Sequence, residues 1–108
     1  MGETEVFFFR ERKGGKIPLL EWLDRLGELG HELRRPEADF LRDGVYELRA
    51  SYQGVHYRML YFFVGRAVVV VSHGLTKERD VPRREIEQAI RRRLLVEGNF
   101  EQFTFKPE

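Results

Sequence analysis

Strand-like alternation of apolar and polar residues fills the middle of the chain. Three runs rich in β-branched and aromatic side chains lie at residues 45–52, 55–64 and 67–73. Short segments that contain glycine, at residues 53–54 and 65–66, separate these runs, and glycine accepts the positive φ of a two-residue hairpin turn. The pattern therefore predicts a three-stranded antiparallel meander with two-residue turns.

Helical spacing replaces the alternation on both sides of the meander. An apolar stripe at i, i+3, i+4 and i+7 follows Pro18, and a similar stripe follows Pro82, where a proline suits the first helical turn. The stripes consist of Leu19, Trp22, Leu23 and Leu26, and of Ile86, Ala89, Ile90 and Leu94. We therefore predict a short N-terminal helix and a C-terminal helix over residues 81–98.

The remaining segments complete an α+β domain. Residues 4–9 are predicted to form a strand of the same sheet, whereas residues 31–43, with a proline and mixed charges, are predicted to be a connection. The tail after residue 98 is expected to be partly extended and packed through its phenylalanines. These elements predict a single domain over residues 1–108, with a mostly antiparallel sheet of about four strands.

Composition narrows the class of protein. The 108 residues are 42% hydrophobic with a net charge of +1, so one core can form and overall charge says little about partners. No cysteine is present, which excludes disulfides and zinc–thiolate sites. No apolar run reaches the roughly 18 residues of a membrane span. We expect a soluble, cytoplasmic protein that does not bind membranes.

The predicted meander gathers basic side chains into one row. Two-residue turns place Arg49 opposite Arg58 and Arg58 opposite His73, and directly opposed residues share a face of the sheet. His56 lies beside this row because residues two apart on a strand also share a face. Lys77 follows four residues after His73, at the same end of the third strand. Opposed arginines repel, so the row is expected either to hold an anion or to be neutralised by acids.

Both interpretations of this row are open at the level of sequence. As an anion site, the guanidinium groups would clamp a phosphate, and a histidine among arginines would keep a neutral, base-competent form near pH 7. As a structural feature, the row would be satisfied by local ion pairs, because Glu47 lies diagonal to Arg58 and Glu78 follows Lys77. The geometry depends on turn length, since a slip of one residue moves a side chain to the other face.

Weaker signals lie elsewhere in the chain. The last helix is basic, which suits a phosphate backbone, but glutamates are interleaved with its arginines as on a solvated face. The residues concerned are Arg83, Arg84, Arg91, Arg92 and Arg93, with Glu85, Glu87 and Glu97. Tyr57, Tyr61 and Phe63 alternate along one strand and either stack on bases or belong to the core. The histidines lack the spacing of a metal site, so no metal or other cofactor is predicted.

Three motifs occur in the same order as in a known family. The segments DGVYELR, HYRMLYFF and HGLTKERDVPRREIEQAIRRR resemble the phage-derived HigB branch of the RelE toxin superfamily, over residues 31–97. The resemblance implies a RelE-like fold and the toxin of a type II toxin–antitoxin system, with a helix-turn-helix antitoxin as its partner. It also implies an endoribonuclease that cleaves mRNA on the translating ribosome, in which the ribose 2′-OH attacks the adjacent phosphate without a metal.

The resemblance also implies site residues. Arg49 matches the arginine of ELR, Arg58 and Tyr61 match YR-x-x-Y, and Lys77 matches the lysine after HGL. In these roles the arginines clamp the phosphate, the lysine stabilises the developing charge or helps the leaving group, and a histidine acts as general base. The predicted catalytic residues are Arg58, Lys77, Arg49 and His73, with His73 or His56 as the base, and the predicted RNA contacts are His56, Tyr61, Arg79, Arg83 and Arg84.

Two departures from the family pattern matter. Relatives commonly carry a second lysine where this chain has Glu78, and they usually have a second N-terminal helix that is largely missing here. Both faces of the meander carry large apolar residues, so the missing helix would leave one face uncovered: Tyr46, Leu48, Met59 and Tyr61 lie on one face, and Leu60, Phe62 and Val69 on the other. An uncovered apolar face predicts a homodimer, or the exchange of a strand or helix, at that surface. The alternative to an active toxin is a truncated, catalytically inactive module that binds an antitoxin or RNA.

Overall fold

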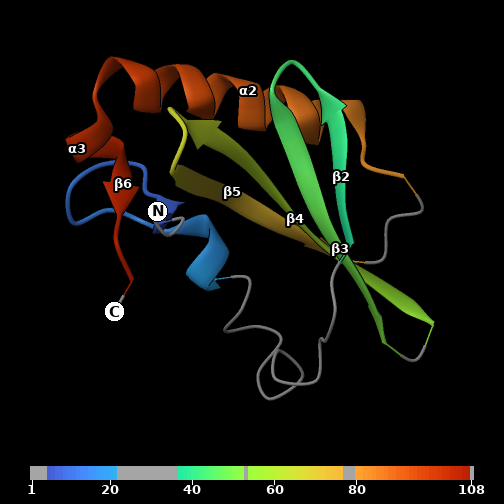
Figure 1. Ribbon diagram of the computed structural model, residues 1–108. Coiled ribbons are helices and arrows are strands. Elements are labelled where there is room, and N and C mark those ends of the chain that lie inside the picture. The colour runs from blue at the N-terminus through green and yellow to red at the C-terminus, as the bar shows by residue number, and fades with distance from the viewer. Residues whose placement is uncertain (1–4, 22–36, 53, 77–79, 108) are drawn as a thin grey trace.

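A six-stranded sheet with helices packed against it forms the structure, a computed structural model (Figure 1). The structure describes residues 5–21, 37–52, 54–76 and 80–107. The strand order is β2-β3-β4-β5-β1-β6. The elements are β1 (Glu5–Phe9), β2 (Glu37–Arg42), β3 (Val45–Tyr52), β4 (Val55–Val64), β5 (Val68–Thr76), α2 (Arg83–Gly98), α3 (Phe100–Phe103) and β6 (Thr104–Phe105), with a helical turn at residues 18–21. The predicted α+β, RelE-like architecture is confirmed, with six strands in place of about four.

Strand β2 corrects the prediction of a connection over residues 31–43. It pairs antiparallel with β3 at one edge of the sheet. Asp43 and Gly44 form the turn between them with φ values of 50° and 81°, as the favoured Asp-Gly hairpin turn requires. Mixed charge is compatible with a strand at a sheet edge, which explains why charge misled the prediction. Residues 31–36 lie outside the described part of the chain.

The predicted register between β3 and β4 is confirmed. Tyr52 pairs with Val55 across a two-residue turn, in which Gly54 has a φ of 80°. Counting back from this turn, Arg49 lies directly opposite Arg58. Turn chemistry alone was enough to fix this pairing, because the glycine takes the positive φ that the turn demands.

The predicted two-residue turn between β4 and β5 is wrong. Val64 pairs with Val68, so residues 65–67 make a three-residue turn. A difference of one residue in the turn reverses the face on which every following side chain lies. Val69 accordingly packs in the cluster around Tyr61, on the side opposite to the one predicted.

A β-bulge at Ser72 reverses the face a second time. The register shifts by one residue there, so Leu60 pairs with His73, and Arg58 pairs with Leu75. The predicted pairing of Arg58 with His73 is therefore wrong. Because the two shifts cancel, His73 still lies on the face that carries Arg58, two positions along the sheet.

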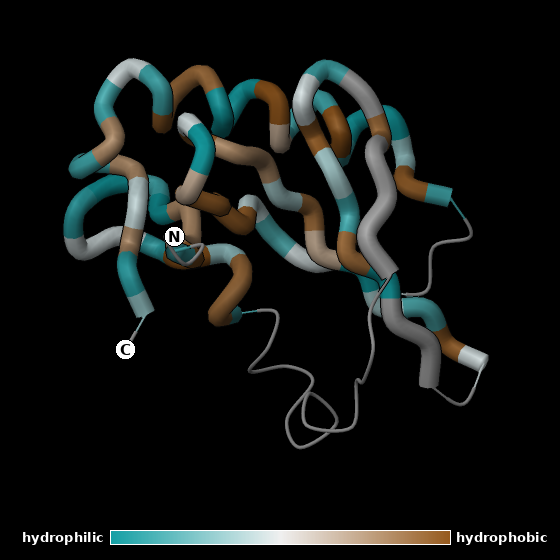
Figure 2. The backbone as a smooth tube through the Cα atoms, viewed as in Figure 1, coloured by the Kyte–Doolittle hydropathy of each residue, from teal (hydrophilic) through white to brown (hydrophobic). Residues whose placement is uncertain are grey.

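Helix α2 covers one face of the sheet, and the helical turn at residues 18–21 contacts the other. Helix α2 lies along one face, where Val96 packs against Phe62 (Figure 1). Apolar and polar residues alternate along α2 in Figure 2, as expected for a helix that buries one stripe. On the other face, Leu19 of the helical turn packs against Tyr61. Arg58 shares a face with Phe62, so the predicted basic row lies on the side that α2 covers.

The first and last strands of the described chain, β1 and β6, lie next to each other at one edge of the sheet. As predicted for the first strand, β1 belongs to this sheet, pairing in parallel with β5, and β6 pairs with β1. Phe100 and Phe103 pack against the core beside α2, which confirms the predicted packing of the tail. No helix within the described ranges is long and apolar enough to cross a membrane. The expected loss of a second N-terminal helix concerns residues 22–36, which lie outside the described residues.

Candidate functional site

Two arginines and a buried glutamate form the β3–β4 cluster, which consists of Glu47, Arg49 and Arg58. Glu47 Oε2 lies 3.7 Å from Arg58 Nε, and Glu47 Oε1 lies 3.9 Å from Arg49 Nη1. Glu47 is 3% exposed and Arg58 is 6% exposed, whereas the side chain of Arg49 is 36% exposed. The carboxylate contacts both of the opposed arginines and offsets their repulsion. Glu47 lies diagonal to Arg58 in the sheet, as the interpretation of the row as local ion pairs requires.

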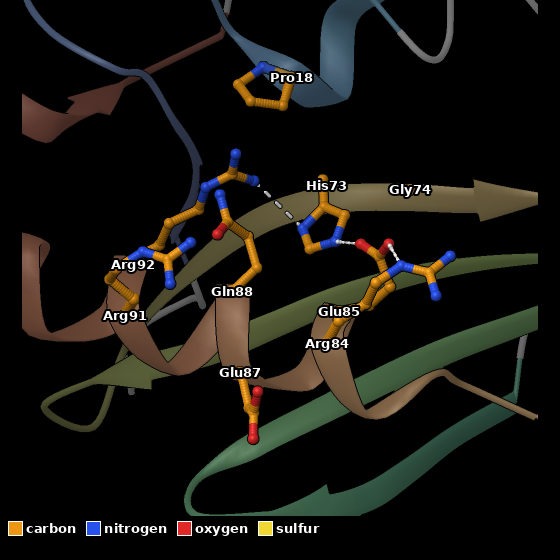
Figure 3. A pocket seen from close by; sticks show the side chains of 9 residues that line it. All are labelled: Pro18, His73, Gly74, Arg84, Glu85, Glu87, Gln88, Arg91 and Arg92. Atoms are coloured by element: carbon orange, nitrogen blue, oxygen red, sulfur yellow. Dashed lines mark hydrogen bonds and ion pairs between the residues drawn. The ribbon is translucent and has the colours of Figure 1, made fainter.

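A second polar cluster, the β5–α2 network, consists of Ser72, His73, Glu85 and Arg92. Ser72 Oγ lies 2.7 Å and Arg92 Nη1 lies 3.2 Å from His73 Nδ1, and Arg92 also donates to Ser72 Oγ at 3.2 Å. His73 Nε2 lies 2.9 Å from Glu85 Oε1 (Figure 3). A guanidinium only donates, so Nδ1 is an acceptor and the ring proton lies on Nε2. These contacts assign the neutral His73 tautomer that donates to Glu85.

Burial and charge keep His73 neutral. Burial lowers the pKa of His73, the Arg92 cation lowers it further, and the hydrogen bond to Glu85 opposes both effects. Burial also lowers the pKa of Arg92, although a guanidinium stays charged at any ordinary pH. Arg92 Cζ lies 4.8 Å from the centroid of the Phe9 ring, in cation–π geometry. The network therefore holds a neutral imidazole beside a half-buried cation.

The β5–α2 network borders a pocket of about 530 Å³ that lies between α2, β5 and Pro18 (Figure 3). Within the described ranges, β5 pairs with β1 only as far as Val71, and the pocket lies beside the part of β5 that follows. Its lining residues are Pro18, His73, Gly74, Arg84, Glu85, Glu87, Gln88, Arg91 and Arg92. The pocket therefore brings three arginines of α2 next to His73.

The residues predicted to form one row lie in two neighbouring clusters. Arg58 belongs to the β3–β4 cluster and His73 belongs to the β5–α2 network. His56 is exposed and shares a face with Arg58, two residues away on the same strand. Lys77 and Arg79 lie outside the described residues. The sheet thus brings together Arg49, Arg58 and His56, and it places His73 beside them.

Tyr61 lies on the face opposite Arg58, because it follows Arg58 by three positions, an odd number, along β4. It is 8% exposed and stacks on Tyr46 with 5.5 Å between ring centroids. Burial and the neighbouring Tyr46 raise the pKa of Tyr61. This environment favours the core interpretation of Tyr61 over a role in stacking on RNA bases.

The arginines of α2 do not form one uniform basic face. Arg83 Nε lies 3.1 Å from Glu87 Oε2, and Arg84 Nε lies 3.4 Å from Glu85 Oε2. Arg93 Nη1 donates to the carbonyl oxygen of Asp43 at 2.5 Å and ties the β2–β3 turn to the helix. The interleaved glutamates thus pair with the predicted RNA contacts Arg83 and Arg84, as on a solvated helix face.

The sequence does not single out Ser72, Glu85 and Arg92 as a unit. Glu85 and Arg92 are seven residues apart, so a helix places them on one face, and this spacing is the signal that could have joined them. The bulge at Ser72 carries no comparable signal. Among the residues that the structure describes, no group of three or more His, Asp or Glu side chains is placed to hold a metal ion.

The sheet and the helix that covers it define an α+β fold of the RelE-like type. A family model described as "Phage derived protein Gp49-like (DUF891)" matches residues 16–94, which is more than half of the chain. The chain therefore belongs to this phage-derived Gp49-like family, a RelE/toxin-like family, and it is a toxin-like module for which the family suggests an antitoxin partner. Neither a curated protein nor a solved structure matches the chain.

Proposed function

We propose that this protein is the toxin of a type II toxin–antitoxin system and cleaves mRNA on the translating ribosome, in the cytoplasm. Membership of a toxin-like family supports the toxin role, and the HigB-like motifs favour a helix-turn-helix antitoxin. The observation that carries the enzymatic part is the direct pairing of Arg49 with Arg58. Thr76 pairs with Tyr57 beside them, and the chain continues from there into Lys77. In the proposed site, these two arginines and Lys77, the lysine of the family motif, act on one phosphate.

The proposed reaction uses no metal ion. The ribose 2′-OH attacks the adjacent phosphorus, the bond to the 5′ oxygen breaks, and a 2′,3′-cyclic phosphate and a 5′-OH remain. Arg49, with its partly exposed side chain, contacts a phosphate oxygen, and Lys77 offsets the charge that develops in the transition state. Arg58 adds its positive field and holds Glu47, which in turn holds Arg49.

His56 is the better placed general base of the two candidate histidines. It is exposed and shares a face with Arg58. The single acceptor nitrogen of neutral His73, Nδ1, already accepts from Ser72 and Arg92, so it cannot take a proton from the 2′-OH in this arrangement. We therefore assign the base to His56 and a supporting role to His73.

A catalytically inactive module that binds an antitoxin or RNA is the second candidate. The observation that favours it is the burial of Arg58, which is 6% exposed and contacts Glu47. A side chain expected to clamp the scissile phosphate is thereby engaged within the fold. In this case the protein would keep its partner but lose its toxicity.

Induced expression in a bacterial host distinguishes the two candidates. We expect growth arrest and message cleavage with the wild type, and neither with Arg49→Gln/Lys77→Gln. As a control, Arg66→Gln/Lys13→Gln removes the same charge at exposed positions outside both clusters and should remain toxic. Circular dichroism checks that each protein is folded. A folded wild type that neither arrests growth nor cleaves message would exclude the enzyme and leave the inactive module.

The aromatic face opposite α2 supports a homodimer as a further part of the proposal. Phe63 is 41% exposed and packs edge-to-face on Tyr46 and Tyr61. Exposed aromatic surface of this kind favours association. We expect size-exclusion chromatography with light scattering to give the mass of a dimer, and Phe63→Ser to shift it toward a monomer. A wild-type monomer at micromolar concentration would contradict this part.

A further inference from the structure

Arg92 is a half-buried cation whose nearest partners are neutral. Its Nη1 contacts Ser72 Oγ and His73 Nδ1, and its guanidinium lies over the ring of Phe9. Within the described part of the chain, no carboxylate forms an ion pair with it. Burial of this charge is unfavourable, and Glu11 and Glu85 offset it only in part because neither pairs with Arg92 directly, so an anion bound here would stabilise the arrangement further.

The carboxylates that line the same pocket are already engaged. Glu85 accepts a hydrogen bond from His73 Nε2 and pairs with Arg84. Glu87 pairs with Arg83 and, in Figure 3, points away from Arg92. The part of the pocket between His73 and the C-terminal half of α2 is therefore lined by Arg91 and Arg92.

The guanidinium of Arg92 has one edge left for a ligand. Its hydrogen bonds to Ser72 and His73 all use Nη1, and among the described residues Nε and Nη2 make none. Two parallel donors on one edge of a guanidinium match two oxygens of a phosphate. Arg91 is exposed and lines the same pocket, where it can add a second contact.

We propose that this pocket binds a phosphate group of the RNA chain, with Arg92 as the anchoring residue. Its volume of about 530 Å³ falls within the roughly 300–1,000 Å³ of small-molecule sites, so a nucleotide fits. The inference rests on the proposed function, and it adds an RNA contact separate from the β3–β4 cluster. Because Arg92 also contacts His73, the ring of His73 reports on occupancy.

The test follows the ring signals of His73 by NMR in the full-length protein. Inorganic phosphate is titrated first, and then a 2′-O-methyl RNA trinucleotide, which has no 2′-OH to attack its phosphates. We expect both probes to shift the His73 signals in the wild type. Arg92→Gln should weaken binding by about tenfold or more, Arg92→Lys by less because it keeps the charge, and Arg66→Gln by less than about twofold.

Several results would overturn the inference. The wild type could bind neither probe, or it could bind phosphate but not the trinucleotide. Alternatively, folded Arg92→Gln could bind both probes with the affinity of the wild type. If Arg92→Gln does not fold, Arg92→Lys and Arg91→Gln decide, and wild-type affinity in both rejects the site. Failure of this inference is separable from failure of the proposed function. Suppose that the wild type does not arrest growth but binds the trinucleotide, and that Arg92→Gln loses this binding. These results would support the pocket as an RNA-binding site and would reject only the enzymatic activity.

Discussion

The β3–β4 cluster and the β5–α2 network share one face of the sheet and both contain arginine, yet their carboxylates lie in different places. In the β3–β4 cluster, Glu47 is buried in contact with Arg49 and Arg58. In the β5–α2 network, Glu85 is bound by His73, while Arg92 contacts neutral groups on the other side of the imidazole. The position of the nearest carboxylate therefore decides how strongly an arginine is tied into the fold: buried Arg58 is held by Glu47, whereas Arg92 has only neutral groups as direct contacts among the described residues.

The largest expected effect is on stability, at Arg58. Arg58→Ala leaves the carboxylate of Glu47 buried without this partner, and we expect a loss of about 3–5 kcal/mol in the free energy of unfolding. Urea denaturation measures it. Glu47→Gln/Arg58→Gln removes both charges and should cost less than the two single changes added together. A loss below about 1 kcal/mol in Arg58→Ala would show that the pair does not stabilise the fold.

Arg92→Gln sharpens the contrast between the two clusters. Its partners are neutral, and a glutamine can still donate a hydrogen bond, so we expect a loss of about 1–2 kcal/mol. The same urea experiment measures it beside Arg58→Ala. An equal loss in the two variants would mean that the clusters do not differ in the way proposed.

The pH dependence of stability tests the neutral state of His73. Its pKa in the folded protein lies below the ordinary value of 6.5, and the groups that face it are Arg92 and Glu85 from α2, with Arg58 diagonal to it on β4. As the pH falls through 6.5 toward the folded pKa, the unfolded chain binds a proton that the folded chain does not. The free energy of unfolding therefore decreases, by about 1.4 kcal/mol for each unit of pKa difference.

His73→Gln is the control for this titration. We expect it to flatten the decrease between about pH 6.5 and the folded pKa of the wild type, as measured by urea denaturation across that range. Superimposable pH profiles of the two proteins would mean that His73 titrates with an ordinary pKa.

The smallest effect is expected at an exposed pair on the same helix. Arg83 and Glu87 lie 3.1 Å apart, but the Arg83 side chain is 81% exposed. Arg83→Gln should therefore change the free energy of unfolding by less than about 0.5 kcal/mol. A thermal or urea unfolding curve measures it, and a loss as large as that of Arg58→Ala would undo the distinction between buried and exposed pairs.

Turn chemistry explains how much of the fold could be predicted from the sequence. The turn at Gly54 fixes the register of β3 and β4, so the opposition of Arg49 and Arg58 was predictable. The third residue of the β4–β5 turn and the bulge at Ser72 were not predictable, because no residue type in the sequence requires them. Their opposite effects on the face explain why His73 was placed on the correct side with the wrong partner.

Edge strand β2 shows the reverse case. Its Asp43-Gly44 hairpin signal is present in the sequence, but the charged residues before it outweighed that signal. The β5–α2 network could be predicted only in part, because it depends on how α2 is rotated against the sheet. The spacing of Glu85 and Arg92 gives a shared helix face, and only tertiary packing turns that face toward His73.

The chemistry of the cleaved ends tests the proposed function most directly. Purified wild type and Arg49→Gln/Lys77→Gln would each be added to a cell-free translation reaction, and the ends of the message fragments would be identified. The account predicts 2′,3′-cyclic phosphate and 5′-OH ends with the wild type and intact message with the variant. Intact message with folded wild type, or fragments that carry 3′-OH and 5′-phosphate ends, would contradict it.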